Sequence, residues 1–366
     1  MLRGMDQPVR FRCSACGHEQ APDPVDWRCP VCGGVWDLAP FPVSFPVDAL
    51  RSRPRSVWRW AEALPVPAHV TMGEGGTPLV PLGGWGPLVK VEYAMPTLSF
   101  KDRGAAVLVS AMAHAGVGGV VVDSSGNAGT AMAAYAARAA LRCDVFVPAT
   151  TSPAKLAQAE AHGATVHRVD GTREDVAAAA QAAVAEGLGA YASHVYDPRF
   201  LHGTKTIAYE VWEALGSVPD VVVLPVGNGT LVLGAAIGFA DLVGAGLAER
   251  VPRIVAVQAA GCAPIAEAFA AGRDDVPAVV GQPTAAEGIA IAAPPRGAQV
   301  LAAVRATGGE VVTVGEADVV AARRELAASG FYVEPTAAVP FAGWARHVQD
   351  RSAVVPLCGA GIKAPG

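Results

Sequence analysis

The chain has 366 residues, of which 52% are hydrophobic and 17% charged, and its formal net charge is −5. A chain of this length and composition is too apolar to be disordered and can form two lobes with separate cores, while its longest apolar runs, 221–226 and 231–240, fall well short of the roughly 20 residues that a membrane span needs. Its acidic balance gives no electrostatic reason to bind nucleic acid, and its charged first residues are unlike a signal peptide, so we expect a cytoplasmic protein.

Two Cys-x-x-Cys pairs lie near the N-terminus, and their members are Cys13, Cys16, Cys29 and Cys32. Four thiolates at this spacing can surround one tetrahedral Zn²⁺ and leave no open coordination position, which predicts a structural metal site. The segment is too short to bury a core of its own, so metal binding would supply most of its folding free energy. The alternative is a set of reduced thiols without metal.

A proline-rich stretch, 40–67, is expected to connect this ribbon to the main body. From about residue 117, short runs rich in Val alternate with Ala-rich stretches of helical length. This alternation predicts βαβ units and mostly parallel sheets with helices on both faces, where ligands gather at the carboxyl ends of the strands. The expected strand and helix pairs are 120–122 with 128–140, 145–147 with 154–162, 166–169 with 175–185, 221–226 with 231–239, and 254–257 with 263–270.

Lys101 lies in the segment Ser-Phe-Lys-Asp-Arg-Gly, directly before an apolar helical stretch. Burial and the nearby positive charge of Arg103 would lower its pKa, and an unprotonated lysine amine can form a Schiff base. A surface lysine at the start of a helix would have the same local pattern. The lysine therefore needs support from other parts of the chain.

Two loops between a strand and a helix provide that support. The turn 123–129, Asp-Ser-Ser-Gly-Asn-Ala-Gly, directs amides and hydroxyls at an anion, although helix capping would use the same residue types. The loop 225–230, Pro-Val-Gly-Asn-Gly-Thr, has the composition of a phosphate cradle at a helix N-terminus. It lacks the Lys-Ser/Thr of a Walker loop and the third glycine of a dinucleotide loop.

Five motifs in order, together with the ribbon, resemble the threonine synthase family of fold type II PLP enzymes. The motifs are 73–79 (Gly-Glu-Gly-Gly-Thr-Pro-Leu), 99–104 (Ser-Phe-Lys-Asp-Arg-Gly), 124–129 (Ser-Ser-Gly-Asn-Ala-Gly), 227–229 (Gly-Asn-Gly) and 334–338 (Glu-Pro-Thr-Ala-Ala). The resemblance implies an α/β fold of two three-layer α/β/α lobes and a homodimer that binds an amino-acid substrate. The implied divisions are 1–45 for the zinc ribbon and the start of the linker, 46–104 with 206–366 for the large PLP-binding lobe, and 105–205 for the small lobe.

The resemblance also implies roles for individual residues. Lys101 would form the Schiff base, Asn127 would bind the phenolic oxygen of pyridoxal 5'-phosphate (PLP), and Cys358 would face its pyridine nitrogen. A thiol there, unlike a carboxylate, would not hold the nitrogen protonated, which suits elimination chemistry, although Cys358 also reads as an ordinary buried thiol. The implied phosphate-binding residues are Gly227, Asn228, Gly229 and Thr230. The implied substrate-binding residues are Thr97, Ser124, Ser125 and Arg199.

The substrate is where the sequence departs from the family. The family's Asn-Pro-x-Arg element supplies an arginine to the substrate phosphate, but the matching position here holds Phe200, and Arg199 stands one residue away. The first hypothesis is a threonine synthase that eliminates phosphate from O-phosphohomoserine and adds water. The second is a related β-elimination or β-replacement enzyme, such as a threonine or serine dehydratase, a cysteate-synthase-like enzyme or an enzyme making an unusual amino acid. A third is a non-catalytic protein that binds a partner through its ribbon.

Overall fold

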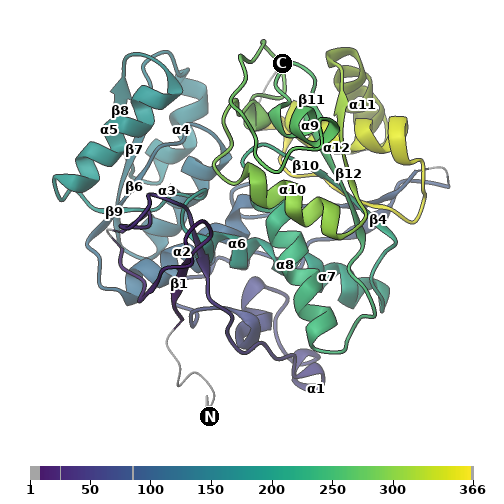
Figure 1. The fold of residues 1–366 in the computed structure, drawn as a ribbon, viewed down its shortest axis with the longest axis horizontal. Helices are drawn as coiled ribbons and strands as arrows, with labels where there is room; N and C mark the ends of the chain where they lie inside the picture. The colour runs from purple at the N-terminus through teal and green to yellow at the C-terminus, as the bar shows by residue number, and fades with distance from the viewer. Residues whose placement is uncertain (1–8, 25, 85, 364–366) are drawn as a thin grey trace. The chain divides into compact units, whose positions relative to one another are not determined.

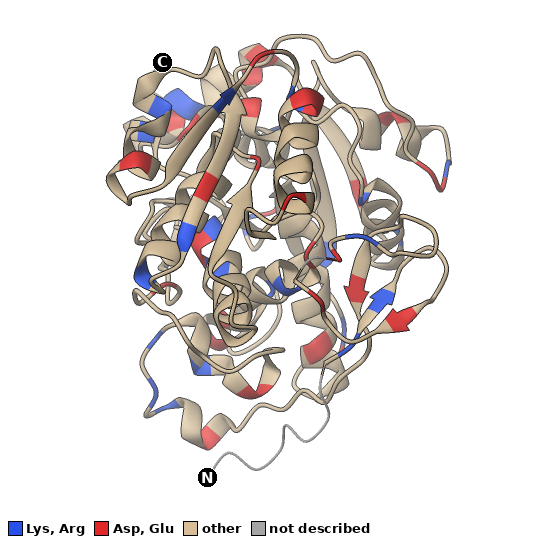
Figure 2. Ribbon diagram, turned by 90° about the vertical axis from the view of Figure 1, so that its left-hand side faces the viewer, with Lys and Arg blue, Asp and Glu red and all other residues tan. Residues whose placement is uncertain are grey.

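The structure is a computed structural model that describes residues 9–24, 26–84 and 86–363. Contacts divide the chain into two compact units, Met1–Glu74 with Lys101–Gly203 and Gly75–Phe100 with Thr204–Gly366. Among the described residues, no helix has both the length and the apolar character required to cross a bilayer. Basic and acidic residues are interspersed over the described elements (Figure 2).

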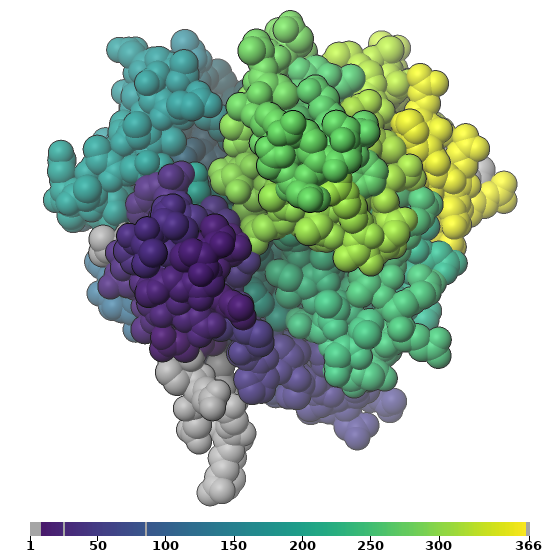
Figure 3. All heavy atoms as spheres, in the orientation of Figure 1, coloured from purple at the N-terminus to yellow at the C-terminus, as the bar shows by residue number. Residues whose placement is uncertain are grey.

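The first unit begins with the ribbon, an antiparallel sheet in the order β2-β1-β3. Its strands are β1 (Phe11–Cys13), β2 (Glu19–Gln20) and β3 (Trp36–Leu38). Phe11 and Trp36 form its small core together with two cysteines, Cys13 and Cys29. Figure 3 shows the ribbon in dark purple as a compact body on the surface. So small a core cannot hold the ribbon folded without further links.

The main sheet of the first unit is parallel, in the order β8-β7-β6-β9 (Figure 1). Its strands are β6 (Gly119–Val122), β7 (Arg142–Pro148), β8 (Thr165–Val169) and β9 (Ala190–Tyr191), and its helices are α2 (Lys101–His114), α3 (Asn127–Arg138), α4 (Pro153–Ala161), α5 (Arg173–Ala185) and α6 (Pro198–Thr204). Alternate strand residues face opposite cores. Val120 and Val145 pack in the core with α2, α3 and α4, whereas Val121 and Phe146 pack with α5. The result is a three-layer unit.

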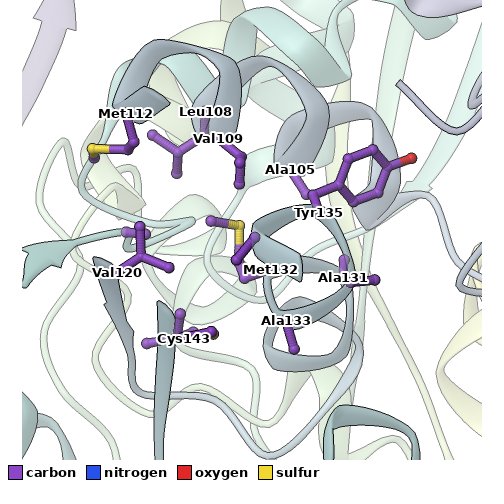
Figure 4. Packing of buried hydrophobic residues seen from close by; sticks show 14 of the residues in the cluster. Ala105, Leu108, Val109, Met112, Val120, Ala131, Met132, Ala133, Tyr135 and Cys143 are labelled. Atoms are coloured by element: carbon purple, nitrogen blue, oxygen red, sulfur yellow. The ribbon is translucent and has the colours of Figure 1, made fainter. Parts of the chain in front are cut away.

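Helices α2 and α3 share one buried apolar core (Figure 4). Ala105 and Leu108 of α2 belong to the same core as Ala131 and Met132 of α3. Burial of this apolar face fixes the axis of α2, and therefore the place of its first residue, Lys101.

Residues 46–74, which we expected in the larger lobe, belong to the first unit. They include α1 (Val47–Leu50) and the 3₁₀ helix η1 (Val57–Ala63). Val57 and Val70 enter the α2–α3 core, and the amides of His69 and Val70 donate hydrogen bonds to Ser110 Oγ at 3.2 and 3.1 Å. These contacts explain why the segment joins the unit that contains α2.

The second unit is built on a six-stranded sheet in the order β12-β11-β10-β13-β5-β4, in which only β4 is antiparallel to its neighbour. The strands are β4 (Leu79–Pro81), β5 (Leu88–Lys90), β10 (Val221–Pro225), β11 (Arg253–Ala259), β12 (Glu310–Val314) and β13 (Val354–Pro356). The helices are α7 (Thr206–Leu215), α8 (Thr230–Gly244), α9 (Pro264–Ala270), η2 (Glu287–Ile289), α10 (Gly297–Ala306), α11 (Glu316–Ala328), α12 (Pro335–Gly343), η3 (Trp344–Val348) and η4 (Gly361–Lys363). The predicted fold class and the five predicted strand and helix pairs are confirmed.

Candidate active site

The loop 226–230 of the second unit connects β10 to α8 and has the backbone of an anion cradle. Gly229 adopts φ +86°, and a Cβ there would lie 2.3 Å from Val300 Cγ2. A Cβ at Gly227 would lie 2.9 Å from Ile289 Cα. Both glycines are therefore required by the backbone path. Because α8 begins without a side-chain cap among the described residues, its first amides remain available to an anion.

A second loop, 357–360, leaves the same edge of the same sheet. Its strand, β13, is parallel to β10 with Val354 opposite Val222, so the two loops emerge beside each other. Cys358 is buried in this loop, and its carbonyl accepts a hydrogen bond of 3.0 Å from the amide of Phe100. Ser99 pairs with Gly359, and no described residue lies within hydrogen-bonding distance of its buried Oγ. Because buried hydroxyls normally form a hydrogen bond, this one favours the binding of a polar ligand at the strand ends.

Thr97, the predicted substrate-binding residue of the second unit, lies just before this pairing. Its side chain is buried, and its carbonyl accepts a hydrogen bond of 2.8 Å from Lys363 Nζ. Of the predicted site residues, the second unit thus holds Thr97, Gly227, Asn228, Gly229, Thr230 and Cys358.

Lys101, the first residue of α2, is half-buried in the first unit. Its Nζ lies 5.7 Å from the centroid of the Phe200 ring. Gly104 leaves room for that ring, since a Cβ there would lie 2.4 Å from Phe200 Cε1. Gly203 is packed as tightly, because its Cβ would lie 2.1 Å from the carbonyl oxygen of Arg103. The first turn of α2 and the turns of α6 therefore fit against each other through glycines.

The turn 124–127 precedes α3 in the same unit. Ser124, Ser125 and Asn127 are half-buried, and Gly126 occupies the cap position of the helix. Gly129 is needed for the turn, because a Cβ there would lie 1.9 Å from the carbonyl oxygen of Ser124. No side chain caps α3 among the described residues, so its first amides, like those of α8, remain available to an anion.

Arg199 is held by an acidic neighbour. Its Nε donates to Asp197 Oδ1 at 2.9 Å, and its Nη2 donates to Asp197 Oδ2. The Arg199 and Asp197 side chains are only 6% and 8% exposed, so the pair is buried. The Arg199 amide also donates to Asp197 Oδ1 at 2.9 Å. With both oxygens of the carboxylate engaged, the guanidinium is committed to Asp197.

His194 is a buried neighbour of Phe200, with the two ring centroids 5.8 Å apart and an interplanar angle of 67°. Burial lowers the pKa of His194 well below its usual value, and the charges of Lys101 and Arg173 lower it further. The imidazole is therefore neutral at neutral pH. Its Nδ1 is buried, and among the described residues no hydrogen-bonding partner reaches it.

The four cysteines of the ribbon come together as the spacing predicts. Their Sγ atoms all lie within 4.8 Å of one another, and the Cys13–Cys32 and Cys16–Cys29 distances, 3.4 and 3.7 Å, are too long for disulfide bonds. Burial raises the pKa of Cys13, but hydrogen bonds from backbone amides and neighbouring thiols lower it to about 7. The Gly34 amide lowers the pKa of Cys32, but neighbouring thiols raise it to about 12. A divalent cation would stabilise all four thiolates, so the donor set fits a metal.

The pyridoxal-phosphate dependent enzyme profile matches residues 70–359. This chain belongs to that family. A threonine synthase of Methanosarcina acetivorans is 33% identical over 97% of this chain and 92% of its own length, and one of Methanocaldococcus jannaschii is 34% identical over 97% and 93%. Matches of that length include most of the ribbon. Among solved structures, a threonine deaminase of T.th. is 27% identical with a TM-score of 0.68, over 78% of this chain and 92% of its own.

The residues present fit the family's cofactor. The start of α8 after Gly227 and Gly229 has no side-chain cap among the described residues, so its first amides are available to a phosphate. The adjoining loop holds the buried thiol of Cys358, and Ser99, which pairs with Gly359 of that loop, has a hydroxyl that no described residue satisfies. The protein is thus a PLP-family enzyme of the threonine synthase type with a cysteine cluster suited to metal.

Several contacts near the site were missed from the sequence. The pairing of Asp197 with Arg199 has a signal, since the two are separated by one residue at the start of a helix. The residues around Ser99 give no hint that its hydroxyl lacks a partner among the described residues. A buried network in which Glu210 accepts from the Gly76 amide and from Lys90 Nζ, at 2.8 and 2.7 Å, also had no local signal, because its members are far apart in sequence.

Proposed function

We propose that this protein is a PLP-dependent lyase that eliminates a leaving group from an amino acid, with Lys101 carrying the cofactor as a Schiff base. The observation that carries the proposal is the match to two threonine synthases over nearly the whole chain, most of the ribbon included. The uncapped start of α8 at Gly229 supports the placement of the phosphate.

The cofactor would be held mostly by groups that do not react. Gly227, Asn228, Gly229 and Thr230 would bind its phosphate, Asn127 its phenolic oxygen and Cys358 its pyridine nitrogen. When bound, PLP withdraws electrons from the α carbon of the amino acid and so acidifies its α proton. The amine of Lys101, displaced by the substrate, would move protons at the α and β carbons. Ser124, Ser125 and the first amides of α3 would receive the substrate carboxylate, and Thr97 would also bind the substrate.

The first candidate substrate is O-phosphohomoserine. Loss of its γ-phosphate and addition of water at the β carbon would give threonine, as the names of the two archaeal relatives suggest. On this hypothesis a cation other than Arg199 has to bind the phosphate, or Arg199 has to leave Asp197.

The second candidate is a β-elimination or β-replacement substrate without a phosphate, such as threonine or serine. The pairing of Arg199 with Asp197 and the phenyl ring of Phe200 favour it, since neither offers a free cation to a dianion. His194 lies beside Phe200, and no described residue forms a hydrogen bond with its Nδ1. This atom of the neutral imidazole could form a hydrogen bond with an uncharged hydroxyl of the substrate.

A substrate panel separates the two candidates. The purified protein, loaded with PLP, is incubated with O-phosphohomoserine, O-phosphoserine, threonine and serine, and free phosphate, keto acid and threonine are measured. Phosphate and threonine formed in equal amounts from O-phosphohomoserine would establish the first candidate. Keto acid from threonine or serine, without turnover of O-phosphohomoserine, would establish the second.

Lys101→Ala tests the cofactor assignment itself. The variant should lose the visible absorption of the lysine-bound cofactor and at least about a hundredfold in turnover, because one residue serves as both the covalent attachment and the base. Lys155→Ala, which removes a lysine from the exposed start of α4, is the matched control. An unchanged visible spectrum in Lys101→Ala would reject Lys101 as the attachment point.

Three expectations accompany this function. We propose that the cysteine cluster binds one Zn²⁺, that the enzyme is a homodimer, and that it acts in the cytoplasm. Elemental analysis of the purified chain and sedimentation velocity test the first two, with one zinc per chain and a dimeric mass as the expected results.

A further inference from the structure

The ribbon contacts a defined part of the first unit through residues that surround its metal ligands. Trp27 packs edge-to-face on Tyr191, with ring centroids 5.1 Å apart at 76°, and on Tyr196, 4.8 Å apart at 68°. Its ring thus joins the core that also contains α5. Aromatic pairs of this geometry stabilise beyond their buried area.

Arg28 strengthens the same contact. Its guanidinium carbon lies 4.5 Å from the Trp27 ring centroid and 4.7 Å from the Tyr196 ring centroid, so it contacts both rings. Its Nη2 donates a hydrogen bond of 2.5 Å to the Tyr196 hydroxyl. Arg28 directly precedes Cys29 in the sequence. The backbone that carries Trp27 and Arg28 is thus joined directly to one of the four predicted metal ligands.

A second contact involves the ribbon core itself. The Arg199 guanidinium carbon is 5.2 Å from the centroid of the Phe11 ring, and Phe11 packs with Cys13 and Cys29 in the ribbon. Phe41, just after β3, lies 5.3 Å from the His202 ring. The ribbon thus meets the segment 191–202 at both its beginning and its end.

This segment is the one that carries Phe200 to Lys101. Phe200 follows Arg199, and its ring lies 5.7 Å from Lys101 Nζ and against Gly104. Arg199 is fixed by Asp197 on one side and by Phe11 on the other. A shift of the ribbon would therefore displace Phe200, the neighbour of Lys101.

We propose that the ribbon is a metal-dependent positioning device: with a metal on its four thiolates, Trp27, Arg28 and Phe11 fix the segment 191–202 and so keep Phe200 beside Lys101. The catalytic meaning of this coupling rests on the proposed function, whereas the coupling itself does not. The ribbon core is too small to hold these side chains in place without metal.

Hydrogen–deuterium exchange of the full chain, without substrate, measures the coupling directly. Peptides from 191–204 report the segment, and peptides from β6 and β7 report the sheet core. Zinc-loaded protein is compared with protein stripped by a chelator, and metal content is measured in both. We expect stripping to speed exchange in 191–204 at least about tenfold while the sheet core stays protected, because a segment opens more often once the aromatic packing that holds it is released.

Two variants separate the contact from the metal. Trp27→Ala, with zinc still bound, should reproduce the faster exchange in 191–204, and Trp27→Phe should restore most of the protection because it keeps an aromatic ring. Arg12→Ala is the matched control, since Arg12 lies in β1 of the same ribbon and pairs with Glu19 of the ribbon, 3.9 Å away. It should exchange like the unaltered chain.

Three results would overturn the proposal. They are unchanged protection of 191–204 after the metal is removed, an effect of Trp27→Ala no larger than that of Arg12→Ala, and full protection in a chain purified without any metal. If stripping exposes the whole sheet, the zinc-loaded Trp27→Ala variant decides the outcome. If the unaltered protein turns over none of the substrates in the panel while metal removal still speeds exchange in 191–204, the proposed function is rejected and this inference stands.

Discussion

The loop 226–230 of the second unit and the segment 191–202 of the first unit are held by different means. The loop is determined by its backbone, because Gly229 at φ +86° and Gly227 leave no space for a Cβ. The segment is determined by side chains, because Asp197 holds Arg199 and Trp27 of the ribbon holds Tyr196. The loop is one run of consecutive residues, whereas the segment is held partly by a residue 169 positions away in the chain, Trp27 against Tyr196.

On the proposed function, this difference corresponds to two kinds of requirement. A phosphate is the same in every PLP enzyme, so a cradle of amides and a helix N-terminus suffices to bind it. A substrate side chain differs from one enzyme to the next, and side-chain contacts can be exchanged without altering the backbone path. We therefore expect substitutions in the segment to change substrate choice and substitutions in the loop to change cofactor affinity.

The largest effect is expected at Asp197. Asp197→Ala leaves the Arg199 guanidinium buried without its carboxylate, which should cost about 3–5 kcal/mol of unfolding free energy. The measurement is chemical denaturation followed by circular dichroism. It tests whether side-chain pairing holds the segment in place.

The control for this prediction removes both charges. The double variant Asp197→Asn with Arg199→Met leaves no unpaired charge, so it should lose much less stability than Asp197→Ala. If the single and double variants lose the same amount, the pair does not hold the segment. In that case Arg199 becomes available again as a substrate ligand.

The same contrast explains what could be predicted from the sequence. The βαβ alternation, the glycine cradle and the two Cys-x-x-Cys pairs are local patterns, and the structure has β10, α8 and the cysteine cluster where those patterns predicted them. Periodicity and turn chemistry act over a few residues, which is why they can be read from one chain.

The rest depended on contacts between distant residues. The inclusion of 46–74 in the first unit follows from the contacts of Val57 and Val70 with α2 and α3, and no local pattern announces them. The pairing of Arg28 with Tyr196 likewise joins residues 168 apart. A sequence gives the types of such residues but not which of them meet.

Gly229→Ala tests the backbone-determined loop. An L side chain at φ +86° costs about 1–2 kcal/mol, and the Cβ would also press on Val300, so we expect a total loss of about 2–4 kcal/mol and at least about tenfold weaker PLP binding. Gly246→Ala is the matched control, because Gly246 has φ +70° after the end of α8 but nothing within 4 Å of its Cβ. Gly246→Ala should lose only the stability that an L side chain costs at positive φ, and it should keep its PLP affinity. The affinity is measured by spectroscopic titration. Equal PLP affinity in both variants would argue against the loop as the phosphate site.

The smallest effect concerns the surroundings of Phe200. Burial lowers the pKa of His194 well below 6.5, so below about pH 6.5 the unfolded chain binds a proton that the folded chain does not. Stability should therefore fall as the pH is lowered through this range, by at most about 1.4 kcal/mol per pH unit from this residue. His194→Asn removes the titrating group, so its unfolding free energy should change less between about pH 6.5 and pH 5 than that of the unaltered chain. Parallel pH profiles for the two proteins would mean that His194 titrates normally. The surroundings that His194 shares with Phe200 would then not be a desolvated environment built by side chains, and this part of the contrast with the glycine loop would fail.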